Sequence, residues 1–400
     1  MNRLVRRSFL GSIVLAVGSA MVGGAYAQNE IKLGYNGDQS AGGTAEFGIA
    51  GRYGFEAAIQ DINASGGLLG RRVVGVVRDD QGTPPKSIQN MNELIDNEGV
   101  VAVVGPTNSG NAMAWLHIPQ QKKIPVISHV ATGSAITQRY AGEPRNYVFR
   151  LSLIDRDQVA LLAAYAVKAS KGGKIGVIAD TSGYGQGVLK DVMEVLALHG
   201  VKPIVLEKFG PRDVDMTSQL LKIRDAGADT LIAASLSDAN AHLLKSMEKI
   251  GYFPTTLGTW GNGNSPVPNI AGMKLAERIY FIASITGTSN EKSAALHKRL
   301  IAAYPKMTAF DAAAQGYDAV MLLAAAIKQA NSTNGEAVQA ALEDLKPVDG
   351  IIKRYDRPFS KSNHEGLGAS DISMARWQNG QVVPLEDDVI KSLRPTDIKR

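Results

Sequence analysis

The sequence predicts an α/β protein made of two doubly wound lobes, and three observations lead to this class. The strand-like runs are short and almost continuously apolar, which is typical of parallel strands covered by helices on both faces. Helical segments, with apolar residues three and four positions apart, lie between these runs. The chain has 400 residues, enough for two or three domains, and one βα series ends near Arg150 while a second follows it.

The first series of predicted strands covers the N-terminal part of the chain. Its strands are Ile31–Tyr35, Val73–Arg78, Val100–Val104, Pro125–Ser128 and Tyr147–Arg150. Helical patterns cover Phe47–Ala64 and Lys86–Glu98. The first of these helices is expected to end at Gly66 or Gly67, because glycine adopts the left-handed cap that other residues resist.

The second series occupies the rest of the chain. Its predicted strands are Lys174–Asp180, Pro203–Phe209, Thr230–Ser235 and Arg278–Ser284. Its predicted helices are Asp155–Ser170, Val188–His199, Ala239–Ile250 and Ala309–Ala330. Asp155 is interpreted as the cap of the helix that it opens.

Residues 1–27 are predicted to be an export signal. A basic start with Arg3, Arg6 and Arg7 precedes an apolar stretch, and Ala25-Tyr26-Ala27 has the small-x-small pattern of a cleavage site. A transmembrane anchor fits less well, because the stretch is rich in small residues and ends at that site. The ordinary secretory route and the twin-arginine route both stay open. No later stretch is apolar enough to cross a bilayer, so the predicted location is the periplasm of a two-membrane bacterium.

Composition excludes several kinds of function. The chain has no cysteine, which rules out disulfides, a thiol nucleophile, cysteine-bound zinc and a lipid-modified N-terminal cysteine. Lys+Arg 43 against Asp+Glu 38 is too even a balance to hold nucleic acid. The six histidines are scattered without metal-ligand spacing, and none of the common nucleotide, hydrolase or metalloprotease motifs occurs. We therefore expect no metal, no cofactor and no catalysis.

Seven short motifs follow one another along the chain. They are Asp61-Ile-Asn-Ala-Ser-Gly-Gly67, Arg78-Asp-Asp-Gln81, Val104-Gly-Pro-Thr-Asn-Ser109, Val126-Ile-Ser128, Phe149-Arg150, Tyr184-Gly-Gln-Gly187 and Gly316-Tyr-Asp-Ala319. From about Ile31 to about Leu385, the ordered set resembles the branched-chain amino-acid-type (leucine/isoleucine/valine-binding) solute-binding proteins of ATP-driven importers. The resemblance implies the type I periplasmic binding fold, a small-molecule ligand and an inner-membrane permease as partner.

In that fold, two lobes are joined by three crossings of the chain. By resemblance the crossings fall near Ser152–Asp155, Ile279–Ser284 and Pro347–Tyr355. Lobe one would then comprise residues 28–152 and 283–348, and lobe two residues 153–282 and 349–400. Periplasmic binding proteins close by a hinge around their ligand, so the ligand is expected between the lobes.

Lobe one offers four candidate ligand-binding residues. Ser109 follows a strand and stands near the start of a helix, whose free N–H groups and positive end can hold a carboxylate; it could also be a simple helix cap. By resemblance, the backbone of Val130 and the hydroxyl of Thr132 also hold the ligand, although an ordinary β–α turn explains them equally well. Phe47 matches an aromatic wall in relatives or belongs to the core.

Lobe two offers Tyr184, an aromatic residue among glycines, and Trp260. Amino-acid-binding relatives carry an acidic residue at the position of Trp260, where it pairs with the ligand ammonium. A buried ammonium without a partner costs several kcal/mol. Either another carboxylate, Asp238 or Asp180, replaces the missing one, or the ligand is an aromatic or aliphatic acid or an amide without an ammonium group.

Two further residues and one rival function are also compatible with the sequence. Phe310 matches a pocket aromatic of the relatives but fits a helix core equally well, and His129 is the histidine nearest the expected cleft. A ligand-sensing partner of a signalling receptor would use the same fold. That role would need an anchor or an attached partner, and the sequence offers neither.

Overall fold

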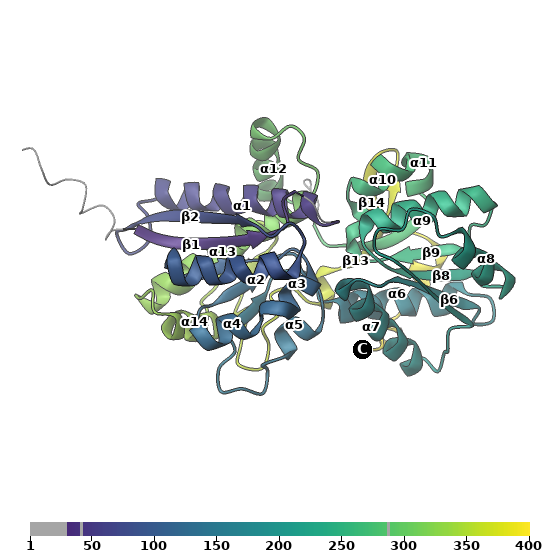
Figure 1. The fold of residues 1–400 in the computed structure, drawn as a ribbon, viewed down its shortest axis with the longest axis horizontal. Coiled ribbons are helices and arrows are strands. Elements are labelled where there is room, and N and C mark those ends of the chain that lie inside the picture. The colour runs from purple at the N-terminus through teal and green to yellow at the C-terminus, as the bar shows by residue number, and fades with distance from the viewer. Residues whose placement is uncertain (1–29, 41–42, 286–288) are drawn as a thin grey trace, which may run out of the picture.

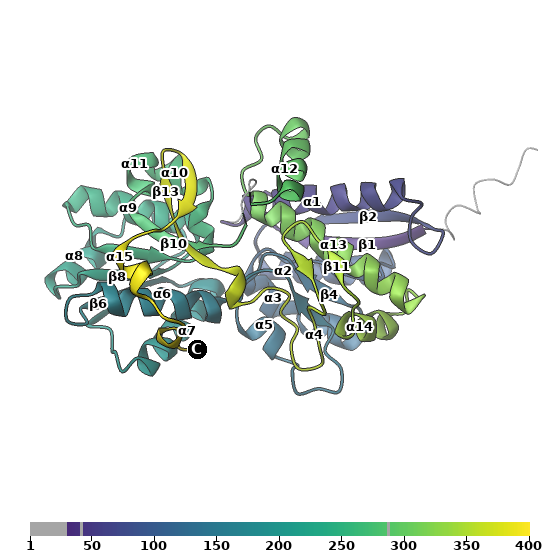
Figure 2. The same ribbon diagram turned by 180° about the vertical axis from the view of Figure 1, so that it is seen from behind.

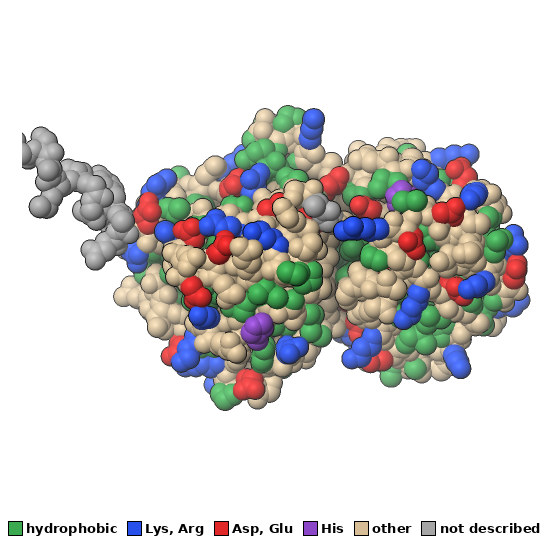
Figure 3. All heavy atoms as spheres, in the orientation of Figure 1, with side chains coloured by type: hydrophobic (Ala, Val, Ile, Leu, Met, Phe, Trp, Pro, Cys, Tyr) green, Lys and Arg blue, Asp and Glu red, His purple; other side chains and the backbone are tan. Residues whose placement is uncertain are grey.

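The structure, a computed structural model, describes residues 30–40, 43–285 and 289–400. The predicted export signal, residues 1–27, lies outside the described residues. Two α/β lobes lie side by side, each built on its own sheet, and they touch across a narrow seam (Figures 1, 2 and 3). Among the described helices, none is both long and apolar enough to cross a membrane.

The sheet of the first lobe has five strands in the order β2-β1-β3-β4-β5, and every neighbouring pair is parallel. Its strands are β1 (Glu30–Gly37), β2 (Arg72–Asp79), β3 (Ala102–Val104), β4 (Val126–Ser128) and β5 (Val148–Arg150). Ligands of such sheets bind beyond the carboxyl ends of the strands, where the strand order reverses. In this lobe the reversal lies between β1 and β3.

Helices cover both faces of this first sheet (Figure 1). The long helices α1 and α13 pack against one another, and α2 packs against α3. The helices of this lobe are α1 (Ala45–Ala64), α2 (Pro84–Asn92) with the π-helical turn Glu93–Asn97, α3 (Ser109–Trp115), α4 (His117–Lys122), α5 (Ala135–Gln138), α12 (Glu291–Ala303), α13 (Phe310–Ala330) and α14 (Gly335–Glu343).

The sheet of the second lobe repeats this strand order and extends it. Strands β7-β6-β8-β9-β10 are parallel, and β13 and β14 continue the sheet in antiparallel pairs beside β10. Its strands are β6 (Ile175–Asp180), β7 (Val205–Phe209), β8 (Thr230–Ala234), β9 (Thr255–Gly258), β10 (Ile279–Ala283), β13 (Ser373–Gln378) and β14 (Gln381–Pro384).

Helices also cover both faces of the second sheet. They are α6 (Asp155–Ala169), α7 (Gly183–Leu198), α8 (Thr217–Asp225), α9 (Ser237–Ile250), the 3₁₀ turn η3 (Trp260–Gly263), α10 (Pro266–Ala271), α11 (Met273–Ala276), α15 (Asp388–Ser392) and the 3₁₀ turns Ala369–Asp371 and Pro395–Asp397. Helix α7 begins at Gly183, five residues before the predicted start, because the Ser182 side chain accepts a hydrogen bond from the Gly185 N–H and caps the helix. Tyr184 therefore lies in the first helical turn rather than in a loop.

The apolar strands divide their side chains between two cores. In β3, Ala102 and Val104 face the cluster under α1 and α13, whereas Val103 faces the cluster under α2 and α3. In β6, Val177 and Ile178 alternate in the same way between the two faces of the second sheet. Because both faces are buried, no polar face is needed, which explains the continuous apolar runs. The two doubly wound lobes predicted from these runs are confirmed.

The C-terminal crossing differs from the predicted position near Pro347–Tyr355. The hairpin of β11 (Val348–Asp349) and β12 (Arg354–Tyr355) stays on the first lobe, because the Tyr355 hydroxyl donates a 2.8 Å hydrogen bond to Asp318 of α13. Further along, the Gly366 N–H donates to the Arg150 carbonyl at 2.8 Å beside β5. The chain reaches the second sheet only at β13, so residues 349–366 lie with the first lobe (Figure 2).

Candidate functional site

A cavity of about 390 Å³, counted to include its open mouth, lies between the lobes. Six of the seven residues predicted for the site line it, namely Phe47, Ser109, Val130, Thr132, Tyr184 and Trp260. The other lining residues are Thr44, Thr107, Asn108, Ala131, Ser235, Leu236, Ser237, Thr259 and Gly261. The cavity is thus lined by segments that follow the carboxyl ends of strands in both sheets.

Ser109 supplies a hydroxyl from the first turn of α3. Its Oγ accepts a 3.0 Å hydrogen bond from the Gly133 N–H, which leaves the Ser109 hydrogen available to a ligand. The cap of the helix is Asn108, whose side chain accepts from the N–H groups of Gly110 and Asn111. The reading of Ser109 as the cap is therefore wrong, and two of the helix N–H groups expected to hold a carboxylate are already engaged.

The turn from Val130 to Gly133 follows β4 and is held by a buried ion pair. Arg150 Nη1 donates to the carbonyl oxygens of Thr132 and Gly133, at 2.7 Å each. Its Nε and Nη2 atoms both donate to the Glu365 carboxylate at 2.6 Å. Arg150 has no exposed surface. The guanidinium thus fixes the turn, and with it the Thr132 side chain that faces the cavity.

Tyr184 and Thr259 form the polar part of the opposite wall. The Tyr184 hydroxyl and the Thr259 hydroxyl are 2.6 Å apart and share a hydrogen bond. Burial raises the pKa of Tyr184 well above its usual value, so this hydroxyl stays protonated and can donate. The Thr132 hydroxyl also lies within its hydrogen-bonding reach. The hydroxyls of the two lobes therefore meet at this point.

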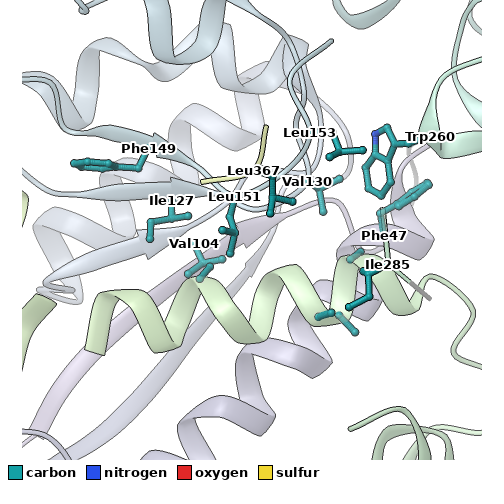
Figure 4. Packing of buried hydrophobic residues seen from close by; sticks show 14 of the residues in the cluster. Phe47, Val104, Ile127, Val130, Phe149, Leu151, Leu153, Trp260, Ile285 and Leu367 are labelled. Carbon is teal, nitrogen blue, oxygen red and sulfur yellow. The ribbon is translucent and has the colours of Figure 1, made fainter. Parts of the chain in front are cut away.

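Phe47 and Trp260 form the apolar part of the cavity, one ring from each lobe. Their rings meet edge to face with centroids 5.2 Å apart, and Figure 4 shows them facing each other beside Val130 and Leu153. The backbone N–H of Trp260 donates to Gln158 Oε1 at 3.0 Å, which anchors the start of η3 against α6. Edge-to-face aromatic pairs add about 0.5–1.5 kcal/mol beyond the area that they bury. This contact therefore helps to hold the lobes together.

Tight backbone contact between the lobes occurs beside the cavity. The N-termini of α3 and α7 meet there, and a methyl group placed on Gly183 would lie 2.9 Å from the Gly110 Cα atom. On the other side of the cavity, the Ser265 hydroxyl of the second lobe donates to Glu46 of α1 at 2.5 Å. These contacts describe a closed arrangement of the lobes.

The side chains that line the cavity carry no formal charge. Asp238 instead faces a separate groove between the lobes, together with Arg212, Asp213 and His242. Burial, and next to it the charges of Glu46 and Asp38, raise the pKa of Asp238 to about 6.

Asp180, the other candidate for an ammonium partner, is buried. It accepts hydrogen bonds from the Ser182 N–H and hydroxyl and from the Leu236 N–H. It serves to hold the turns after β6 and β8. Neither of these two carboxylates is among the residues that line the cavity.

Two other candidates lie outside the cavity. Phe310 packs edge to face against His297 and faces a different pocket. His129 is buried, and burial lowers its pKa to about 3. Its Nε2 lies 3.0 Å from the Tyr35 hydroxyl, which donates to the Gly48 carbonyl at 2.6 Å. It is therefore a neutral core histidine.

Sequence reasoning missed most of the hydroxyls that line the cavity. Ser235 and Ser237 follow β8, and Thr259 follows β9, in the positions where Ser109 and Val130 follow strands of the first lobe. Polar residues directly after apolar strands were the signal that could have found them. Thr44 and Thr107 lie at the ends of segments after β1 and β3 and follow the same rule.

Comparison with known proteins identifies the family. The family model described as "Periplasmic binding protein" matches residues 30–381. The chain belongs to the periplasmic binding protein family. Within it, this periplasmic binding protein has the type I fold, as the ordered motifs predicted. It is a binding protein rather than an enzyme.

Curated relatives and solved structures agree with this membership. A Leu/Ile/Val-binding protein homologue of Brucella melitensis is 27% identical over 378 residues, which cover 94% of this chain and 99% of the relative. A type 1 periplasmic binding protein of Bordetella pertussis has a TM-score of 0.78 at 26% identity, covering 89% and 100% of the two chains. The substrate-binding protein LivJ of Streptococcus pneumoniae, solved in complex with isoleucine, has a TM-score of 0.75 at 24% identity over the same shares, which shows the fold.

Proposed function

We propose that this protein is the exported solute-binding component of an ATP-driven importer. It would bind a small carboxylate-bearing ligand between its lobes and deliver it to an inner-membrane permease. The observation that carries this proposal is a cavity between the lobes that both lobes line with hydroxyl groups and aromatic rings. The names of the relatives, which are Leu/Ile/Val-binding and leucine-specific binding proteins, support a branched-chain amino acid as ligand. The family supports the permease as partner and the periplasm as location.

In this proposal, Ser109 and Thr132 hold the ligand carboxylate. The free hydrogen of Ser109 favours this role, and so does the Arg150 anchor behind Thr132. Phe47, Tyr184 and Trp260 enclose the body of the ligand. The backbone of Val130 completes the first wall.

A second candidate ligand class is an organic acid that has no ammonium group. The specific observation in its favour is that none of the described residues that line the cavity is acidic. By resemblance, Trp260 stands where amino-acid-binding relatives have an acidic residue. The matched pair leucine and 4-methyl-2-oxopentanoate distinguishes the two classes, because these molecules differ only at the carbon that carries the amino or oxo group.

Mass spectrometry of compounds that co-purify with the protein tests both classes directly. The unfolding temperature is then measured in the presence of leucine, isoleucine, valine, 4-methyl-2-oxopentanoate or phenylacetate. A true ligand stabilises by RT ln(1 + [L]/Kd), so its shift grows with concentration. Protein that carries no small molecule and is stabilised by none of these acids would contradict the proposal.

A further inference from the structure

Asp155 is a buried carboxyl whose position the fold alone does not explain. It is the first residue of α6, directly after the crossing from β5, and it has no exposed surface. The prediction that it caps the helix is wrong, because the residue at the N-cap is Ile154 and no side-chain cap hydrogen bond forms. A buried carboxyl is costly unless hydrogen bonds or charges compensate for the lost water.

Hydrogen bonds link Asp155 to residues in both walls of the cavity. On the first lobe, its N–H donates to the Thr132 carbonyl at 2.9 Å, and the Thr132 hydroxyl is close enough to lower its pKa by hydrogen bonding. Towards the second lobe, Gln158 Nε2 donates to Asp155 Oδ1 at 3.3 Å. Gln158 Oε1 in turn accepts from the Trp260 N–H at 3.0 Å. Asp155 thus contacts Thr132 directly and reaches the backbone of Trp260 through Gln158, and both Thr132 and Trp260 line the cavity.

The charges around Asp155 do not provide it with a cation of its own. Arg150 of β5 faces it, but this guanidinium is bonded twice to Glu365. Asp191 of α7 also faces it and adds repulsion, and the Tyr184 hydroxyl of α7 stays protonated. Asp155 Oδ2 is buried and makes no well-formed hydrogen bond with any described residue. This oxygen is therefore the place where a proton would sit.

We propose that Asp155 is a positioning residue that sets the direction of the Thr132 hydroxyl, an inference that rests on the proposed function. When the carboxyl is protonated, Oδ2–H donates to Thr132 Oγ1, and the Thr132 hydrogen points to the ligand carboxylate. When the carboxyl is ionised, it accepts the Thr132 hydrogen, and Thr132 presents lone pairs to the ligand. The cavity then repels an anionic group.

The protonation of Asp155 determines the pH range over which the affinity for an anionic ligand changes. Burial raises the pKa of Asp155 to about 7, with the charge of Asp191 adding to the rise. The protonated form binds the anion, so affinity for a carboxylate is highest at low pH. By linkage, binding takes up a proton, and affinity falls by up to about tenfold for each pH unit above that pKa.

Calorimetric titration from about pH 6 to about pH 8.5 tests the proposal, because leucine and 4-methyl-2-oxopentanoate keep their charges in this range. The proteins are wild type, Asp155→Asn and Asp155→Ala. Asparagine reproduces the protonated pattern, since its amide oxygen can accept from Gln158 and its NH₂ can donate to Thr132. We expect the affinity of wild type to fall as pH rises. Asp155→Ala should bind weakly throughout, and Asp155→Asn should restore binding without the pH dependence.

Several results would overturn the proposal. A wild-type affinity that does not change with pH is one, and a slope that survives in Asp155→Asn is another. A third is an affinity for leucine that increases as pH rises in wild type, together with a loss of leucine binding in Asp155→Asn. That result would mean that Asp155 binds the ligand ammonium. If Asp155→Asn does not fold, Thr132→Val is measured in its place. The proposal then requires that Thr132→Val binds the ligand more weakly than wild type and that its affinity does not change with pH.

A measurement without ligand separates this inference from the proposed function. The folded protein holds the Asp155 proton more tightly than the unfolded chain does. In the unfolded chain, the carboxyl of Asp155 has its ordinary pKa of 3.8. The stabilisation is complete below that value and is lost as pH rises through about 7. The free energy of unfolding of wild type should therefore decline over this range relative to that of Asp155→Asn. If no probe binds and this decline is present, the proposed function fails alone; a constant difference overturns the inference itself.

Discussion

At the scale of single residues, Ser109 and Trp260 make different contributions to the same cavity. Ser109 brings a hydroxyl whose oxygen already accepts from Gly133, so its hydrogen can be donated to a ligand. Trp260 brings a large apolar face and no charge. The first residue bears on the affinity for any carboxylate, and the second on which carboxylate is chosen.

Replacement of Ser109 by alanine should weaken binding of a carboxylate ligand by about 1–3 kcal/mol, because a buried charged acceptor loses its donor. Calorimetric titration of the co-purifying compound or of leucine measures the loss. Ser170→Ala is the matched control, since the Ser170 hydroxyl bonds to Asp229 in the second lobe outside the cavity residues. Equal affinities for wild type and Ser109→Ala would remove Ser109 from the site.

Replacement of Trp260 by glutamate should shift the preference of the cavity towards ligands that carry an ammonium. The new carboxylate attracts leucine and repels 4-methyl-2-oxopentanoate, so the ratio of their two affinities should change by about tenfold or more. Trp260→Gln has nearly the same shape without the charge and serves as the control. If both variants shift the ratio equally, lost packing rather than charge governs the choice.

At the scale of elements, the Arg150–Glu365 ion pair joins β5 to the C-terminal segment that returns to the first lobe. The pair links residues 215 positions apart in the chain. It also supports the turn that carries Thr132. Stability of this lobe and geometry of the cavity therefore depend on one buried interaction.

Replacement of Glu365 by alanine should destabilise the protein by about 3–5 kcal/mol, because it leaves a buried guanidinium without its counterion. Urea unfolding followed by circular dichroism gives the free energy. Glu194→Ala breaks the Arg156–Glu194 pair, in which the Glu194 side chain is 48% exposed, and should cost at most about 1 kcal/mol. Similar losses in the two variants would contradict this account.

The strands and their burial were predictable, because continuous apolar runs such as Val100–Val104 require cover on both faces. The residues Ser109, Thr132 and Trp260 were also predictable as candidates, since each follows a strand or matches a motif. The exclusion of Asp238 from the cavity was not predictable. Asp238 also follows a strand, and only the orientation of the two lobes decides which of these side chains faces the ligand.

The position of residues 349–366 on the first lobe could not be predicted from the sequence for a related reason. The contacts that hold this segment join it to Asp318 and Arg150, and no local pattern marks pairs so distant in the chain. The role of Asp155 was hidden as well. An acidic residue at the start of a helix looks like a cap, and only its buried surroundings show otherwise.

At the scale of the whole molecule, closure of the lobes depends on how closely α3 and α7 approach. Gly110 and Gly183 meet backbone to backbone, and a methyl group on Gly183 would have no room there. Glycine at position 183 is thus needed for the closed arrangement rather than for the helix itself.

Replacement of Gly183 by alanine should favour the open arrangement, because its methyl group would lie 2.9 Å from the Gly110 Cα atom. Alanine stabilises a helix relative to glycine, so the variant should keep its stability while its ligand affinity falls about tenfold or more. Small-angle X-ray scattering with saturating ligand should give a larger radius of gyration than wild type. Gly187→Ala, in the same helix with open space around it, is the control. A compact Gly183→Ala variant with unchanged affinity would contradict this prediction.

The contact of Phe47 with Trp260 has a practical consequence. The chain has three tryptophans, and the other two, Trp115 and Trp377, pack in the separate cores of the two lobes. The indole of Trp260, which contacts Phe47 of the other lobe, changes its surroundings when the lobes part. Its fluorescence emission should therefore report domain movement in the unlabelled protein, and stopped-flow recordings of that emission would time the motion directly.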